Sequence, residues 1–256
     1  MTRSDRLRRL PPGIAYAGAR ALRAATAPQR AARYVADWRR YRRLPGAEPL
    51  RLRHAFPRID DARPTSAYDS HYFFQDVWAA RRIADRRPDR HVDVGSRVDF
   101  VGFLTAVTRV VFVDIRPLEV DLPDLEPIAG SVLALPFADR SLHSVSCLHV
   151  AEHVGLGRYG DALDPAGTRK AAAELQRVLA VGGELLFSLP VGRERVEFNA
   201  HRVHDPRRVR ALFDELDLAE FSGVDDAGRF RRDRSLDELA GQRYACGMFR
   251  LTRAAA

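Results

Sequence analysis

The chain has 256 residues, enough for one large α/β domain or for a medium-sized domain with an appendage. Hydrophobic residues make up 46% and charged residues 30%, and no apolar run approaches the ~20 residues that span a bilayer. These values argue against a membrane-spanning protein. We expect no secretory signal, because no apolar segment follows the basic start, and the two cysteines in apolar runs, Cys147 and Cys246, predict a reduced, cytosolic protein.

The positive charge is concentrated at the start of the chain. Residues 1–43 carry twelve arginines and two aspartates, whereas the whole chain has a net charge of +8, so the remainder is slightly acidic. Lys170 is the only lysine, which indicates a compositional preference for arginine rather than a surface selected to bind nucleic acid. We therefore expect no nucleic-acid partner.

Residues 1–70 are predicted to form a basic helical extension and a linker. Pro28 is expected to stop or restart an Ala-rich helix, and residues 31–44 follow as a second helix with an aromatic stripe at Tyr34, Trp38 and Tyr41. The stripe either packs on the main domain or lies on anionic lipid, because aromatic residues beside arginines suit a membrane interface. Both interpretations stay open. The predicted location is therefore the cytosol, with a peripheral membrane contact through the N-terminal helices as one of the two interpretations.

Residues 71–256 are predicted to form an α/β domain. A helix over 68–84 precedes a buried strand at 91–94, and Ser96 is expected to cap the next helix in a capping box with Asp99. Further strands are expected at 110–113, 142–148, 184–189, 218–224 and 244–252, and 225–234 is expected to be a charged loop.

Two of these strands end on carboxylates that suit a nucleoside. Asp93 and Gly95 follow the first strand, and Asp114 follows the second, where an acidic side chain can accept hydrogen bonds from a ribose diol. A dinucleotide fingerprint needs three glycines to approach a pyrophosphate. The chain has Gly95 alone, followed by Arg97 and Asp99, so a Rossmann oxidoreductase or sugar-nucleotide enzyme is the least favoured alternative.

This succession resembles the class I S-adenosylmethionine (SAM) methyltransferases over residues 88–252. It consists of an acid-x-Gly motif, a second acid, the segment Gly130-Ser-Val-Leu-Ala-Leu-Pro-Phe-Ala-Asp139 and a fourth strand. The loop 149–165 and the segments 188–192 and 198–202 resemble a branch of that superfamily with unknown function. The resemblance implies a doubly wound, mostly parallel seven-stranded sheet and a glycan-related acceptor. It also implies SAM-binding residues, which are Asp93, Gly95, Ser96, Asp114, Ile115, Ser131, Val132, Leu133 and His149.

Histidines are frequent after residue 140, and they suit proton transfer near neutral pH. We predict His153 as the base that deprotonates an acceptor hydroxyl, followed by His201 and Asp161. A metal site among these residues lacks a compact ligand motif, so no metal is predicted. The sequence thus predicts a SAM-dependent O-methyltransferase acting on a small polar or glycan-related acceptor. The alternative is a SAM-binding regulatory or assembly module, and the oligomeric state is left open.

Overall fold

The computed structural model describes residues 12–62 and 64–254. By its contacts the chain divides into two compact units, Met1–Ala67 and Tyr68–Ala256. Within the described residues, no helix combines the length and the apolar character that crossing a membrane requires.

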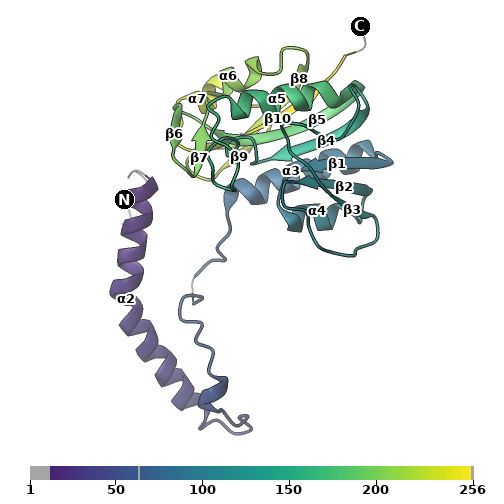
Figure 1. Cartoon of the computed structure of the whole chain (residues 1–256). Coiled ribbons are helices and arrows are strands. Elements are labelled where there is room, and N and C mark those ends of the chain that lie inside the picture. The colour runs from purple at the N-terminus through teal and green to yellow at the C-terminus, as the bar shows by residue number, and fades with distance from the viewer. Residues whose placement is uncertain (1–11, 63, 255–256) are drawn as a thin grey trace. The chain divides into compact units, whose positions relative to one another are not determined.

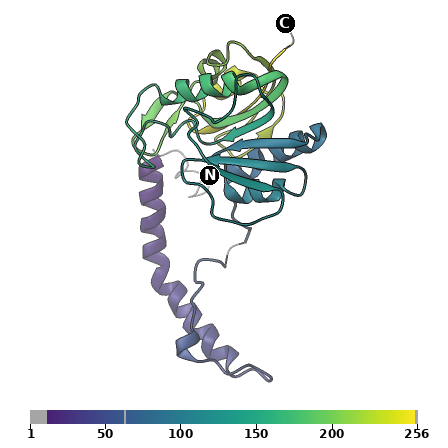
Figure 2. The same ribbon diagram turned by 45° about the vertical axis from the view of Figure 1, so that its right-hand side comes forward.

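The first unit is dominated by one long helix, α2 (Pro12–Tyr41). The prediction that Pro28 divides this segment into two helices was wrong, because α2 runs through Pro28 without a break (Figure 2). Proline has no N–H, so one carbonyl in the preceding turn lacks its helical hydrogen bond. Pro28 is exposed, and water can solvate that carbonyl. The Ala-rich segments on both sides favour the helix. After a turn, the short 3₁₀ helix η1 (Leu52–His54) follows, and Asp60 returns to pair with Arg30 at 3.2 Å.

The second unit is built on one eight-stranded sheet in the order β3-β2-β1-β4-β5-β10-β8-β9 (Figure 1). The strands β1 (Arg90–Val94), β2 (Arg109–Asp114), β3 (Leu125–Ala129), β4 (Leu142–Leu148) and β5 (Leu179–Val191) are parallel. The antiparallel strand β10 (Ala245–Thr252) lies between β5 and β8 (Asp217–Val224). The strand order reverses between β1 and β4, and such a reversal creates a crevice at the carboxyl edge of the sheet.

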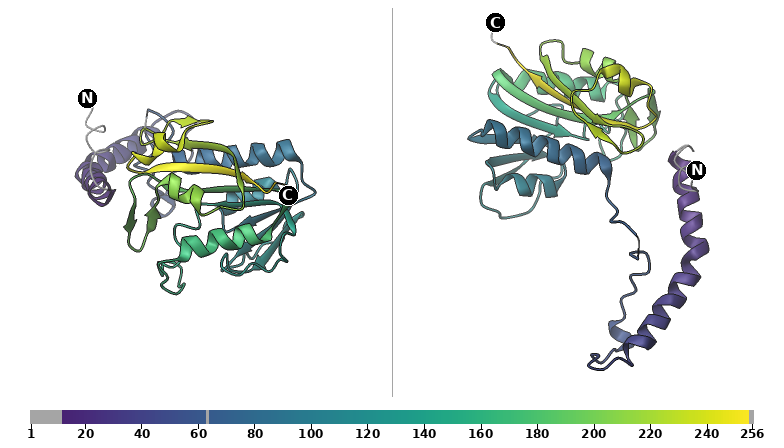
Figure 3. Two further views of the ribbon diagram at one scale, coloured as in Figure 1. Left: turned by 90° about the horizontal axis from the view of Figure 1, so that it is seen from above. Right: turned by 180° about the vertical axis from the view of Figure 1, so that it is seen from behind.

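Helices cover both faces of this sheet, as the view from above shows (Figure 3). On one face, α3 (Ser70–Arg86) and α4 (Val98–Leu104) bury Trp78, Ile83 and Phe100 against β2, β4 and β10. On the other face, α5 (Gly167–Val178), α6 (Pro206–Ala211) and α7 (Leu236–Ala240) bury Leu175 and Val209 against β4 and β5. The predicted doubly wound fold is therefore confirmed.

Two details of the predicted fold need correction. The sheet has an eighth strand, because β9 (Phe230–Arg231), inside the segment expected to be a loop, pairs with β8. A separate hairpin of β6 (Arg195–Glu197) and β7 (His201–Val203) also forms. Both additions are only two or three residues per strand, too short to produce an alternating pattern in the sequence.

The predicted cap of α4 by Ser96 was also wrong. Arg97 occupies the N-cap position without a side-chain hydrogen bond to the helix, which begins at Val98. The Ser96 hydroxyl instead accepts a hydrogen bond from the backbone N–H of Leu148 at 3.1 Å. Ser96 therefore ties the turn after β1 to the end of β4, and this tertiary bond replaces the local one that the sequence pattern favours.

Candidate functional site

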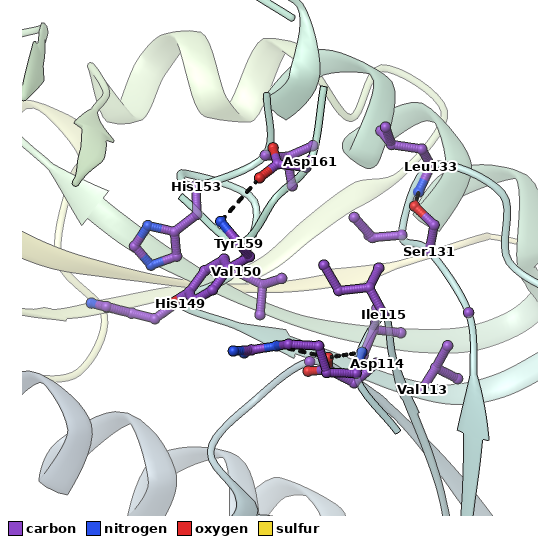
Figure 4. A pocket seen from close by; sticks show the side chains of 16 residues that line it. Val113, Asp114, Ile115, Ser131, Leu133, His149, Val150, His153, Tyr159 and Asp161 are labelled. Atoms are coloured by element: carbon purple, nitrogen blue, oxygen red, sulfur yellow. Dashed lines mark hydrogen bonds and ion pairs between the residues drawn. The ribbon is translucent and has the colours of Figure 1, made fainter. Parts of the chain in front are cut away.

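A cleft of about 700 Å³, partly open to solvent, lies at the carboxyl ends of β1, β2 and β4. Its apolar walls come from Val113, Ile115, Val132, Leu133 and Val150. Figure 4 shows His149 and His153 on one side of the cleft and Ser131 and Leu133 on the other, with Asp114 between them. A largely apolar cleft with a few converging polar groups is typical of a small-molecule site.

Asp93 lies behind the cleft and does not line it. Its side chain is fully buried, where Oδ1 accepts a hydrogen bond from the Ser96 N–H at 3.0 Å and Oδ2 accepts one from the Ser146 hydroxyl. Because that hydroxyl donates to Asp93, it accepts from Nε2 of His91, which lies 2.8 Å away. Burial raises the pKa of Asp93 to about 6 despite these hydrogen bonds. The aspartate thus fixes the turn after β1 rather than facing a ligand.

Gly95 forms the floor of the cleft. It takes a left-handed conformation with φ of 70°, and a Cβ at this position would lie 3.1 Å from Cγ1 of Val150 and 3.8 Å from Oδ2 of Asp114. Within the segment 95–99 it alone has a positive φ, so the side chains of Arg97 and Asp99 are compatible with the path of the loop. These two residues pair with each other at 2.8 Å.

Asp114 ends β2 at the middle of the cleft. Its Oδ1 accepts a hydrogen bond from the Arg116 N–H at 2.7 Å, and its side chain is 17% exposed. The Arg116 guanidinium lies 4.5 Å above the ring centre of Tyr159, which belongs to the loop after β4. This cation–π contact connects two sides of the cleft above the carboxylate.

The segment after β3 makes the opposite wall. Ser131 and Ala134 form an isolated bridge, and the Ser131 hydroxyl accepts a hydrogen bond from the Leu133 N–H at 3.1 Å. This turn places the side chains of Val132 and Leu133 on the cleft, beside Ile115 from the end of β2. The apolar side chains of Ile115, Val132 and Leu133 suit contact with an aromatic base.

The glycine-rich loop 154–165 is tightly packed. A Cβ on Gly155 would lie 2.1 Å from the carbonyl oxygen of Asp164, and the Arg202 guanidinium donates to the carbonyls of Val154 and Asp164 at 2.6 and 3.0 Å. Asp161 accepts from the Gly155 N–H at 2.6 Å. Burial opposes its ionisation, but such backbone hydrogen bonds outweigh burial and lower the pKa of Asp161. Asp161 lines the cleft, yet its carboxylate serves to hold the loop.

His153 presents an unprotonated nitrogen. Its Nδ1 lies 2.6 Å from the carbonyl oxygen of Ala200, which can only accept, so Nδ1 carries the proton. Nε2 keeps its lone pair and lies 3.5 Å from a guanidinium nitrogen of Arg158. Burial, together with the smaller effect of the Arg158 guanidinium, lowers the pKa of His153 to about 4. The imidazole is therefore neutral at physiological pH, as a proton acceptor must be.

Glu152 is a further residue beside the cleft that was not predicted from the sequence. Its side chain is fully buried, and its two carboxyl oxygens have no hydrogen-bond partner among the described residues. Burial raises the pKa of Glu152 to about 8, so this group is protonated at neutral pH. Its Oε1 lies 3.6 Å from Nε2 of His153. Position 152 follows a predicted strand end, but only the fold reveals that it has no partner.

The structure gathers nine of the predicted residues around one cleft and separates three from it. His201 lies behind His153, with ring centres 6.4 Å apart, and pairs with Glu197 at 3.2 Å. Ser96 contacts an adjoining cavity beside Tyr72 and Pro117. Asp93 is the third. The residues on the cleft are Gly95, Asp114, Ile115, Ser131, Val132, Leu133, His149, His153 and Asp161.

Protein families and solved structures include proteins that resemble this chain. Residues 132–239 match a family described as Caenorhabditis protein of unknown function, DUF268. No curated protein matches the chain in sequence. The YcgJ protein of Bacillus subtilis is 13% identical with a TM-score of 0.52, and the alignment covers 72% of this chain and 100% of that chain.

Two other similar structures differ in activity. The N-methyltransferase NodS from Bradyrhizobium japonicum is 15% identical with a TM-score of 0.51, over 76% of this chain and 99% of that chain. The [4+2]-cyclase SpnF is 11% identical with a TM-score of 0.51, over 71% of this chain and 82% of that chain. The predicted resemblance to the methyltransferase fold and to a family of unknown function is confirmed.

Proposed function

We propose that the protein is a SAM-dependent methyltransferase that methylates a hydroxyl oxygen of a small polar or glycan-related acceptor. The observation that carries this proposal is a single cleft that combines Asp114 and the Ser131–Leu133 turn with the neutral imidazole of His153. The fold alone would not suffice, because one fold hosts different reactions. The glycan-related acceptor rests on the sequence resemblance.

The cleft has the features that SAM requires. The Asp114 carboxylate would accept hydrogen bonds from the ribose hydroxyls, and the apolar side chains of Ile115 and Val132 would flank the adenine. The missing side chain of Gly95 keeps the floor open beside Asp114. No glycine follows Gly95 within the loop to let the backbone approach a pyrophosphate, so a dinucleotide fits less well.

The residues of the chain would then align the acceptor and remove its proton. When bound, SAM supplies an electrophilic methyl group on a positively charged sulfur. Nε2 of His153 would take the proton of the acceptor hydroxyl, so that the oxygen could accept the methyl group. The Ala200 carbonyl accepts a hydrogen bond from Nδ1 at 2.6 Å, which orients the ring and stabilises the imidazolium that results.

The experiment that tests this proposal has two stages. Calorimetry compares SAM, S-adenosylhomocysteine and NAD, and we expect the first two ligands to bind and NAD to fail. SAM with a labelled methyl group is then incubated with hydroxyl-bearing sugars, glycosides and sugar nucleotides, and label in the acceptor supports methyl transfer. Binding without transfer to any acceptor would favour a regulatory or assembly module. Absence of SAM binding at millimolar concentration would contradict both functions.

A further inference from the structure

Three buried side chains from distant segments converge beside the cleft. His71 lies in the first turn of α3, His149 follows β4 and Cys246 lies on β10, and all three are at most 8% exposed. One potential ligand atom from each residue lies within 4.8 Å of the others. Two nitrogens and a sulfur grouped in this way suit a transition-metal ion.

A chain of hydrogen bonds fixes the protonation of His149. The amide nitrogen of Gln75 lies 3.2 Å from the Asp76 carboxylate, which can only accept, so the amide oxygen faces Ser188. The Ser188 hydroxyl donates to this oxygen at 2.6 Å and must therefore accept from Nδ1 of His149, at 3.4 Å. Nε2 of His149 thus keeps its lone pair, and it is buried with no hydrogen-bond partner in the described part of the chain.

The other two residues are also prepared as ligands. The His71 ring makes a hydrogen bond to the backbone of Tyr244 and stacks on the Tyr244 ring, with centres 5.0 Å apart and planes 21° apart. Histidines that bind metals commonly use one nitrogen for such an orienting bond and the other for the ion. Cys246 is fully buried and forms no disulfide.

We propose that His71, His149 and Cys246 bind one Zn²⁺ ion. Zinc binds imidazole nitrogen at ~2.0–2.1 Å and thiolate sulfur at ~2.3 Å in tetrahedral geometry, which separates the ligand atoms by about 3.3–3.6 Å. Movements of about 1 Å would bring the three atoms to these separations. The Cys246 thiol would release its proton to solvent on binding, and a water molecule would take the fourth position.

The site would connect the helix to the sheet at the edge of the cleft. It joins α3 to the ends of β4 and β10, and one of its ligands, His149, lines the cleft itself. The Tyr72 ring packs on the His149 ring, with centres 5.2 Å apart. The ion would supply the partner that Nε2 of His149 lacks and would hold this wall in place. The inference does not depend on SAM binding.

Cobalt provides a direct test because Co²⁺ enters zinc sites and absorbs light there. The full chain without a histidine tag is treated with a chelator, dialysed and titrated with Co²⁺ alone. We expect one ion per chain and a thiolate-to-cobalt charge-transfer band, both reversed by Zn²⁺. Cys246→Ser and His71→Asn should abolish the band. The matched controls are Cys147→Ser, at an equally buried cysteine, and His143→Asn, at an exposed histidine, and both should keep it.

Thermal stability guards against variants that fail to fold. At zinc concentrations near 100 times Kd, the Tm of the wild type should rise by roughly 5–10 °C. Folded Cys246→Ser should show no such rise, and if it does not fold, His71→Asn answers the same question. The proposal is overturned if the wild type binds no cobalt, if cobalt binds without the thiolate band, or if the band survives Cys246→Ser.

Discussion

Oε1 of Glu152 lies 3.6 Å from Nε2 of its neighbour His153, and both groups are uncharged at neutral pH. The carboxyl is protonated because burial raises its pKa to about 8, and the imidazole is neutral because burial lowers its pKa to about 4. Glu152 thus keeps its proton although it is an acid, and His153 lacks one although it is a base. A ligand that binds in the cleft beside this pair can change the charge of either group. Such shifted groups are common at functional sites.

Glu152 should make folding less favourable as the pH rises. Its carboxyl ionises near 4.5 when the chain is unfolded and near 8 when folded, so the folded state binds more protons between these values. Relative to Glu152→Gln, the wild type should lose unfolding free energy between pH 4.5 and 8, by up to about 1.4 kcal/mol per pH unit. Urea unfolding of both proteins at pH 5 and pH 8 measures the difference. If wild type and Glu152→Gln differ in unfolding free energy by the same amount at pH 5 and at pH 8, the carboxyl of Glu152 is not buried in its protonated form.

His153→Asn should remove catalysis and keep cofactor binding. Loss of the proton acceptor should lower kcat by roughly 10²–10⁴-fold, whereas the affinity for SAM should stay within a few-fold. Because the pKa of His153 is lowered to about 4, the acid limb of the wild-type rate profile should fall near pH 4 rather than near 6.5. Initial rates across pH 3.5–8 and calorimetry with SAM check these statements. An asparagine variant with wild-type turnover would remove His153 from the chemistry.

Asp114→Ala should weaken SAM binding by roughly 1–3 kcal/mol, because the charged hydrogen bonds to the ribose are lost. Asp99→Ala is the matched control, since this carboxylate pairs with Arg97 at 2.8 Å and is 67% exposed outside the cleft. Calorimetry with both variants separates a specific effect from a general change in charge. Similar affinities for wild type and Asp114→Ala would refute the assignment of the ribose to this residue.

Two glycines of the loop after β4 should respond differently to alanine. Gly155 and Gly160 both have positive φ values, 80° and 85°, but only at Gly155 would a Cβ collide with the backbone, 2.1 Å from the carbonyl oxygen of Asp164. Gly160→Ala should cost about 1 kcal/mol of stability from backbone strain alone. Gly155→Ala should cost more and displace the loop, with loss of SAM binding. Thermal unfolding and calorimetry distinguish the two outcomes.

The N-terminal unit should bind anionic membranes if its helix is interfacial. Around the α2 stripe, Arg33 is 70% exposed, and Val35 and Tyr41 are 44% and 39% exposed. A deletion of residues 1–45 leaves residues 46–256, which contain the whole of the separate compact unit Tyr68–Ala256. Sedimentation with vesicles containing phosphatidylserine should retain the full chain at low salt and release it at high salt. Equal sedimentation of the full and shortened chains would contradict this interpretation.

The sequence predicts the parts of the site that depend on strand ends. Asp114 follows the apolar run 110–113, the family resemblance indicates Ser131, Val132 and Leu133, and parallel strands bring their carboxyl ends to one edge. The capping-box pattern at Ser96 was misleading because a tertiary donor, the Leu148 N–H, takes the hydroxyl. A capping-box pattern contains only neighbouring residues, so it cannot show that a distant N–H binds the same hydroxyl.

Other parts of the site depend on long-range placement. The grouping of His71, His149 and Cys246 follows from the position of β10 beside β5 and from the packing of α3 across the sheet. The missing partners of Glu152 are likewise a property of burial, which neighbouring residues do not reveal. The chemistry of histidine after the fourth strand therefore indicated His153, but nothing in the sequence indicated the carboxyl beside it.

The position of β10 also constrains the order in which the molecule can assemble. This strand is the last of the described elements along the chain, yet it alone joins β5 to β8 within the sheet. During synthesis on the ribosome, β8 and β9 would emerge with no sheet to join until residues 245–252 follow them. Both edges that β10 later fills would remain open during that interval, when unpaired strands are prone to associate with other chains.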